Sequence, residues 1–80
     1  RGAEFYCIQD TAAATQNLLL TATAYGLGSC WVGSFDEHQI RQTLHLDAGL
    51  KPVALIPVGY AAEEPPEVPR RSIDEVTLIM

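Results

Sequence analysis

A glycine-rich stretch with the sequence GLGSCWVGSFDE, residues 26–37, holds the side chains whose chemistry most needs an explanation. Trp31 and Val32 are typical of a buried strand, whereas the surrounding glycines are typical of turns or of backbone that another group approaches closely. A hydroxyl or thiol here could act as a nucleophile only beside a base, and no histidine or aspartate stands at a spacing that supports one. We therefore expect no catalytic side chain. By itself, the stretch predicts either a connector anchored by Trp31 or a surface that a ligand contacts.

Metal-ligating side chains are few and scattered. The cysteines form no CxxC pair, and no ligand-like spacing joins them to the histidines: Cys7, Cys30, His38 and His45. We expect no metal site and no disulfide scaffold, because both need denser patterns of such residues. The simpler interpretation is two structural thiols in a reducing, cytoplasmic setting.

The overall charge argues against nucleic acid as a partner, and the apolar pattern argues against a membrane segment. The chain has ten acidic and five basic residues, a formal net charge of −5, and one adjacent basic pair, Arg70–Arg71. Nucleic-acid-binding proteins carry clustered basic residues, so we expect no such partner. The apolar stretch 12–24 is interrupted by polar residues and is shorter than the roughly 20 residues that span a bilayer.

A strand and a helix are predicted on the N-terminal side of the glycine-rich stretch. Residues 4–10, EFYCIQD, are apolar with features of a period of two, which predicts a strand that leads into a loop. Asp10 stands where a helix N-cap is expected. Residues 11–25 are rich in alanine, leucine and threonine and lack glycine and proline, which predicts a helix of about four turns. Gly26 is expected to end that helix in the left-handed conformation.

A second helix, a strand and an extended arm are predicted after the glycine-rich stretch. Asp36 and Gln39 have the spacing of a capping box at the start of a helix. Residues 53–58 form an apolar run typical of a strand covered on both faces, in which Pro57 indicates an edge or a bulge. Residues 61–80 begin with a proline-rich segment, which predicts an extended arm laid on another part of the protein.

The predicted helix over residues 11–25 contains no charged residue. A helix that is apolar on nearly every side is buried on nearly every side, and eighty residues cannot easily surround one. A sheet of two strands is also marginal by itself. We therefore expect the chain to be part of a larger fold, completed by a missing N-terminal portion, by a second subunit, or by both.

Four pieces of sequence follow one another in a fixed order: DTAAATQNLLL, GLGSCWVGSFD, PVALIPVGY and the basic residues of the arm. Each piece alone is a weak signal, and their order makes the combination specific. In this order they resemble the C-terminal half of the nitroreductase family of FMN-dependent flavoproteins. The resemblance covers about residues 9–76.

The resemblance implies an α+β fold with a central, mainly antiparallel sheet flanked by helices. Residues 1–80 would form the C-terminal part of a single nitroreductase-like domain, with 61–80 as its arm. The resemblance also implies an intertwined homodimer with one FMN in each of two clefts at the subunit interface; a complementary N-terminal polypeptide is the alternative partner. The uncharged helix would lie in the dimer core, and the arm would reach around the fold or the partner subunit toward the flavin phosphate.

Cofactor-binding residues are implied by the same resemblance. The family stretch that runs along the isoalloxazine matches four positions here: Trp31, Val32, Gly33 and Ser34. A backbone amide, that of Gly33 or of Ser34, would donate toward the N5/O4 edge, and glycine at position 33 lets the backbone approach without a Cβ clash. Arg70 matches a basic position that binds the phosphate, for which a guanidinium is suited. The second basic family position is lost unless Arg71 replaces it. By residue type alone, both arginines could be solvated and offset nearby glutamates.

The function implied is that of an FMN-dependent NAD(P)H oxidoreductase. Hydride would pass from NADH or NADPH through flavin N5 to an electron-poor small molecule, such as a nitroaromatic or a quinone, in a ping-pong sequence. The alternative is a non-catalytic chain that keeps the dimerising, scaffolding half of the fold and binds no flavin by itself. Flavin absorbance of the purified protein distinguishes the two.

Overall fold

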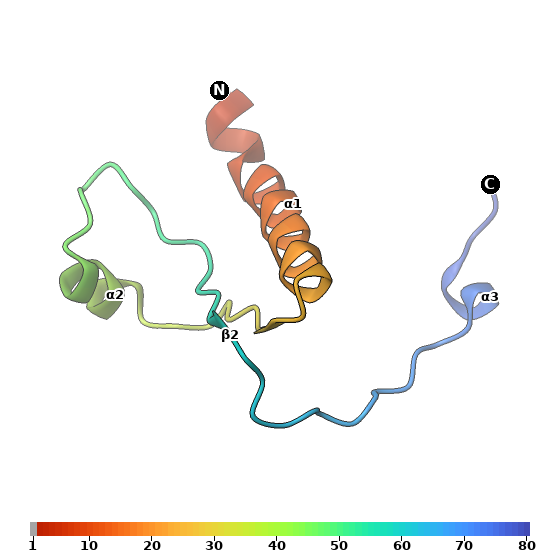
Figure 1. Cartoon of the computed structure of the whole chain (residues 1–80). Helices are drawn as coiled ribbons and strands as arrows, with labels where there is room; N and C mark the ends of the chain where they lie inside the picture. Colours follow the sequence, from red (N-terminus) through yellow and green to blue (C-terminus); the bar gives the residue numbers. More distant parts are fainter. Residues whose placement is uncertain (1) are drawn as a thin grey trace.

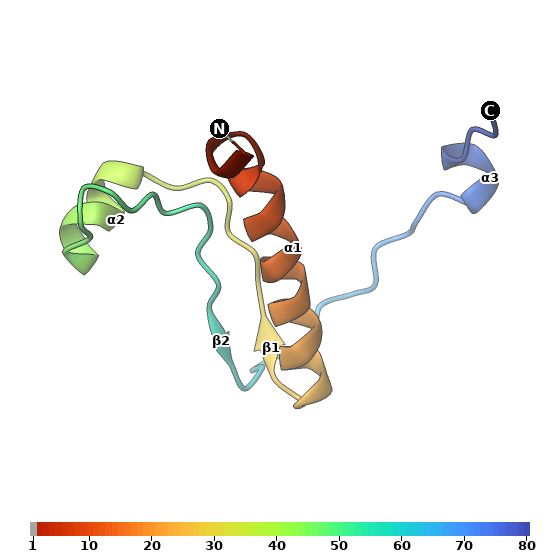
Figure 2. The same ribbon diagram turned by 90° about the horizontal axis from the view of Figure 1, so that it is seen from above.

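The computed structural model describes residues 2–80 as an open arrangement of three helices around one short antiparallel pair of strands (Figure 1). Their bounds in chain order are α1 Gly2–Ala24, β1 Gly28–Ser29, α2 Glu37–Leu44, β2 Val58–Gly59 and α3 Ile73–Val76. In Figures 1 and 2 alike, α2 lies on one side of α1, and the arm that leads to α3 lies on the other.

Helix α1 begins much earlier than the sequence predicts. The predicted strand over residues 4–10 is wrong, as is the N-cap role of Asp10, because both lie inside α1. No glycine or proline interrupts residues 3–25, so nothing in the backbone chemistry ends a helix that starts at Gly2. Thr11 donates its hydroxyl to the carbonyl of Cys7 at 2.6 Å, as threonines inside helices do. A seven-residue apolar window does not distinguish a strand from a helical segment.

The predicted end of α1 at Gly26 is confirmed. Gly26 has φ of +75°, in the left-handed region that favours glycine. The amide of Leu27 donates to the Ala22 carbonyl at 2.9 Å, and the amide of Gly26 donates to the Thr23 carbonyl at 3.0 Å. These two bonds satisfy carbonyls that the helix end would leave unpaired, and they turn the chain sharply back along α1.

Strands β1 and β2 belong to a longer antiparallel ladder with one constant register. Gly28 faces Gly59, and four residues later Val32 faces Leu55 in the same register, with bonds of 2.9 and 3.0 Å between their backbones. The constant register leaves no room for the bulge that was one expectation for Pro57. Pro57 instead faces Cys30, whose amide donates to its carbonyl at 3.3 Å. Since proline has no N–H, the return bond of that pair is missing.

Helix α2 has the predicted capped start. The Asp36 side chain accepts a hydrogen bond from the amide of Gln39 at 3.1 Å, which satisfies one of the free amides of the first turn. The helix ends at His45, which has φ of +53°. The amide of Leu46 then donates to the Arg41 carbonyl at 3.1 Å, so the chain turns back toward the ladder.

One narrow face of α1 is covered by the rest of the chain. Its half-buried and buried side chains, among those that the structure describes, recur every three or four residues: Thr11, Ala12, Thr15, Leu19 and Ala22. Ala22, 6% exposed, is the one buried residue among those whose burial the structure describes. The other faces of α1 are open, with Leu20 59% exposed. Neither α1 nor any other helix within residues 2–80 is long and apolar enough to cross a membrane.

Residues 61–72 form no helix or strand, and the arm over residues 61–80, laid on another part of the protein, stays a prediction. A short helix, α3, then begins at Ser72, whose hydroxyl accepts a hydrogen bond from the Glu75 amide at 3.3 Å. Residues 77–80 are β-prone in sequence but form no strand in the structure.

Candidate functional site

A cavity of about 290 Å³ lies between three segments that are far apart in the sequence. One wall is the N-terminal half of α1, the second is the chain from Trp31 to Glu37, and the third is the segment 51–54 that leads back into the ladder. The helix contributes residues with the spacing of a single face: Ile8, Thr11, Ala12 and Thr15. The fold therefore builds this cavity beside the continuation of the β1–β2 ladder.

Two of the four residues expected along a flavin ring line this cavity. Trp31 and Gly33 are in its wall, and Val32 and Ser34 are not. Successive side chains of an extended chain point to opposite sides, so positions 31 and 33, followed by Phe35, share the side that faces the cavity. Trp31 lies in the cavity wall and is 41% exposed in this chain.

The backbone at Gly33 is open. Val32 uses both its amide and its carbonyl in bonds to Leu55, and the alternation of an antiparallel ladder turns the next amide toward the outer edge. Within residues 2–80, the amides of Gly33 and Ser34 donate no hydrogen bond. A Cβ built on Gly33 would meet no atom within 4 Å, so the packing of the chain itself does not require glycine there.

The two arginines lie away from this cavity. Arg70 and Arg71 are exposed on the arm and do not contribute to the cavity wall. In Figures 1 and 2, the arm leaves the ladder at the end opposite to α2. The guanidinium groups make no hydrogen bond or ion pair with any residue that the structure describes. Within a single chain, the arginines expected to bind the flavin phosphate therefore do not lie beside the residues expected to contact the flavin ring.

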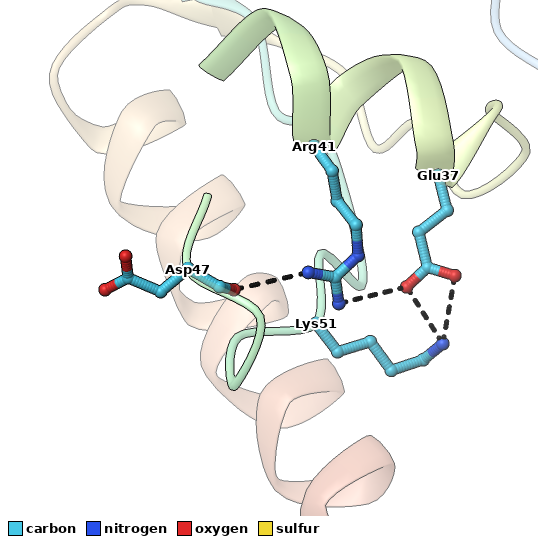
Figure 3. A network of polar contacts seen from close by, with 4 residues as sticks. All are labelled: Glu37, Arg41, Asp47 and Lys51. Carbon is cyan, nitrogen blue, oxygen red and sulfur yellow. Dashed lines mark hydrogen bonds and ion pairs between the residues drawn. The ribbon is translucent and has the colours of Figure 1, made fainter. Parts of the chain in front are cut away.

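Four residues around α2 form a polar network at the rim of the cavity (Figure 3). Lys51 donates from Nζ to both carboxylate oxygens of Glu37, at 3.2 and 3.4 Å. Arg41 lies 3.8 Å from the same carboxylate and donates to the backbone carbonyl of Asp47 at 3.3 Å. The Asp47 carboxylate points away from the network (Figure 3). One carboxylate thus faces two cations, and both Glu37 and Lys51 line the cavity.

Sequence reasoning missed Glu37 and Lys51 as residues of this site. Their partnership spans fourteen positions, so no local motif reveals it. The register that pairs Val32 with Leu55 places Asp36 opposite Lys51 when it is continued, but this register is known only from the structure. The expectation that the protein has no metal site stays a prediction. Within residues 2–80, no three His, Cys, Asp or Glu side chains lie close enough to hold an ion.

A comparison with protein families decides the membership of this chain. The sequence model of the Nitroreductase family matches residues 1–60. The chain belongs to the nitroreductase family. This match includes α1, the glycine-rich stretch, α2 and the ladder, which together form the cavity. The family expected from the sequence is confirmed.

Two of the curated relatives of this nitroreductase-family chain come from archaea. It is 36% identical over 64 residues to a protein of Methanothermobacter thermautotrophicus, and 31% identical over 61 residues to a protein of Archaeoglobus fulgidus. Both carry the name "Putative NADH dehydrogenase/NAD(P)H nitroreductase". The matches cover 75% and 71% of this chain but 34% and 35% of the relatives, so the chain spans about a third of their length.

Solved structures share the fold of the chain, arm included. A nitroreductase family protein from Streptococcus pneumoniae matches 96% of the chain with a TM-score of 0.88 at 27% identity, and the match covers 38% of that structure. A structure from Bacteroides thetaiotaomicron matches 92% with a TM-score of 0.78 at 29% identity, and the match covers 46% of that structure. The expected α+β, nitroreductase-like fold is confirmed.

Proposed function

We propose that this chain forms the flavin-contacting part of an FMN-dependent NAD(P)H oxidoreductase. The observation that carries the proposal is the open backbone of Gly33 beside a cavity walled by Trp31. Free amides, space where a Cβ would stand and an aromatic wall fit a flat, polar-edged ring that rests against the chain. Membership in the nitroreductase family and the names of the archaeal relatives support nicotinamide as the reductant.

Each residue of the stretch has a separate proposed role. The amide of Gly33 or Ser34 donates toward the N5/O4 edge of the ring, and Trp31 covers one side and excludes water. Val32 fixes the position of this backbone segment through its two hydrogen bonds to Leu55. When bound, the flavin supplies the hydride-accepting and electron-donating chemistry, and the protein supplies position and electrostatics.

The expected kinetic scheme is ping-pong. NADH or NADPH occupies the cleft first and leaves, and an electron-poor molecule such as a nitroaromatic or a quinone takes its place. No side chain in the described cavity has a partner that would make it an obligate acid or base, since its ionised groups, Glu37 and Lys51, already pair with each other.

Arg70 is proposed to bind the flavin phosphate of a cleft that a second copy of the chain helps to form. The arm extends away from the cavity of its own chain in both views (Figures 1 and 2). In a homodimer, an arm with this direction is free to reach the partner subunit. Arg71 is the weaker phosphate candidate, because it matches the second basic family position only as a replacement.

FMN titration of the purified protein tests the proposal. Flavin absorbance, quenching of FMN fluorescence, and oxidation of NADH or NADPH with a quinone acceptor are the expected results. Gly33→Val should weaken FMN binding on the order of tenfold, about 1.4 kcal/mol, because its side chain enters the space that the ring would occupy. Gly49→Val is the matched control, since a Cβ at Gly49 also meets no atom within 4 Å and lies outside the cavity.

Two results would contradict the proposal. Equal FMN affinity of the Gly33→Val and wild-type proteins would exclude the ring contact at this position. A colourless protein that FMN does not reconstitute would instead favour the alternative, a scaffolding part of the fold without flavin.

A further inference from the structure

A short window of unpaired backbone separates the ladder from α2. Past the bond between Val32 and Leu55, residues 33–36 run opposite residues 51–54, and within the described chain no backbone hydrogen bond joins these two segments. Proline at position 52 has no N–H to offer. This window contains the two free amides at Gly33 and Ser34.

An ion pair closes the far end of the window. Glu37, the first residue of α2, accepts from Lys51 through both carboxylate oxygens, at 3.2 and 3.4 Å (Figure 3). Its position in the first helical turn suits a negative charge, because the helix N-terminus carries a partial positive charge. Arg41, one turn later on the same helix, holds this carboxylate from the other side at 3.8 Å. The window is therefore bounded by the Val32–Leu55 pair at one end and by the Glu37–Lys51 pair at the other.

We propose that the Glu37–Lys51 ion pair is a positioning device that sets the geometry of the unpaired window and so aims the Gly33 and Ser34 amides at the bound flavin. The proposal rests on the proposed function for its ligand, but it names residues that the family resemblance does not. Lys51 acts through Glu37 and the backbone and need not touch the flavin.

The exposure of the pair limits the size of the effect. The Lys51 and Glu37 side chains are 62% and 40% exposed, so solvent screens their attraction. A pair of this kind contributes little to the stability of the whole fold. It can still shift the equilibrium between ordered and disordered conformations of residues 33–36 and 51–54. Breaking it should weaken FMN binding by about two- to fivefold, the range expected for exposed ion pairs.

The experiment compares Lys51→Met, Glu37→Gln, Lys51→Arg and the charge-swapped double variant Glu37→Lys/Lys51→Glu. FMN affinity, the flavin absorbance spectrum and the melting temperature are measured for each, at low and high salt. We expect the first two variants to lose similar amounts of affinity and to shift the spectrum, because the hydrogen bonds at the ring edge change. Lys51→Arg should regain most of the loss, whereas the double variant should regain only part of it, because a cation at position 37 lies at the helix N-terminus and faces Arg41. High salt should reduce the difference between wild type and Lys51→Met.

Hydrogen exchange in the flavin-free protein gives a readout that does not depend on the ligand. Breaking the pair should let the ladder fray from its nearer end, so the Val32 and Leu55 amides should exchange up to about fivefold faster. The Cys30 amide, bonded further along the ladder, should change less. Glu63→Gln, an exposed carboxylate without a polar contact in the described chain, is the control.

Each outcome separates the two proposals. If wild type binds FMN and the Lys51→Met and Glu37→Gln variants match it in affinity and spectrum, the positioning role is wrong and the proposed function stands. If Lys51→Met alone loses affinity, Lys51 contacts the ligand directly, and the proposed route through Glu37 is wrong. If wild type binds no FMN, the proposed function fails, and unchanged exchange at Val32 and Leu55 would then overturn the positioning role as well.

Discussion

Three glycines of the chain are accommodated in three physically different ways. Gly26 needs its residue type for a positive φ of +75°. At Gly28 space is tight, because an added Cβ would stand 3.3 Å from the Cβ of Ala61, which would have to move by a few tenths of an ångström. At position 33, neither the backbone conformation nor the space within the chain requires glycine. Gly2, Gly49 and Gly59 share this property, and among these four glycines Gly33 is the one that lines the cavity and is proposed to meet the flavin.

Gly26→Ala should lower the free energy of unfolding by about 1–2 kcal/mol, because an L-residue is strained in the left-handed conformation. Urea unfolding followed by circular dichroism measures this. FMN affinity under native conditions should stay unchanged, since Gly26 lies outside the cavity. Gly49→Ala should change stability by less than about 0.5 kcal/mol. Equal stability of the two variants would show that the turn after α1 does not depend on Gly26.

Single residues could be predicted from sequence where their role is local. The helix end at Gly26 and the cap at Asp36 depend on atoms within a few positions, and both are confirmed. Lys51 could not be assigned, because its role depends on a carboxylate fourteen positions away and on the ladder register. Arg70 and Gly33 were expected to contact the same flavin. Within a single chain, however, Arg70 lies outside the cavity that Gly33 lines.

Among the elements, α1 shows most clearly where sequence patterns fail. A capping residue at position 10 and a period of two before it are both weak local signals, and an uninterrupted helix satisfies more backbone hydrogen bonds than a strand followed by a loop. One side of the ladder was predicted in part, since the apolar run 53–58 was expected to be a strand, but the pairing of that run with the glycine-rich stretch was not predicted. The ladder is short, because Pro57 removes one bond and Pro52 lies in the unpaired window.

The capped start of α2 can be tested at the level of the element. Asp36→Ala should cost about 1 kcal/mol of stability, since the amide of Gln39 loses its acceptor. Thermal and urea unfolding measure the loss. Asp47→Ala is the matched control, because the Asp47 carboxylate points away from the network and only its backbone carbonyl is bonded (Figure 3). A stability loss that is as large for Asp47→Ala as for Asp36→Ala would contradict the cap.

As a whole molecule, the chain is far more open than a domain of its size. Its radius of gyration is 16.4 Å, whereas a compact chain of eighty residues has about 12 Å. Its accessible surface is 7397 Å², roughly one and a half times that of a folded protein of equal mass. Large apolar side chains at both ends stay exposed, among them Phe5 at 68% and Ile79 at 91%. We propose that other polypeptide covers these surfaces, and the assignment of residues 1–80 to one domain stays a prediction.

Complementation between two variants tests the shared clefts of the proposed dimer. Gly33→Val damages the ring contact and Arg70→Ala damages the phosphate contact, so each homodimer should bind FMN weakly. If one cleft takes Gly33 from one subunit and Arg70 from the other, a mixed dimer contains one intact cleft and one doubly damaged cleft. Tagged, co-expressed mixed dimers should therefore bind one FMN tightly. If both residues served the same subunit's cleft, no tight site would return.

The alternation along residues 31–35 has a practical consequence for protein engineering. Positions 31, 33 and 35 line the cavity, and positions 32 and 34 do not. A mutant library confined to the odd positions would test which molecules the cavity accepts, while one confined to the even positions would test how this segment is packed. Neighbouring positions in this segment are therefore expected to be under different selective constraints, because one set lines the cavity and the other does not.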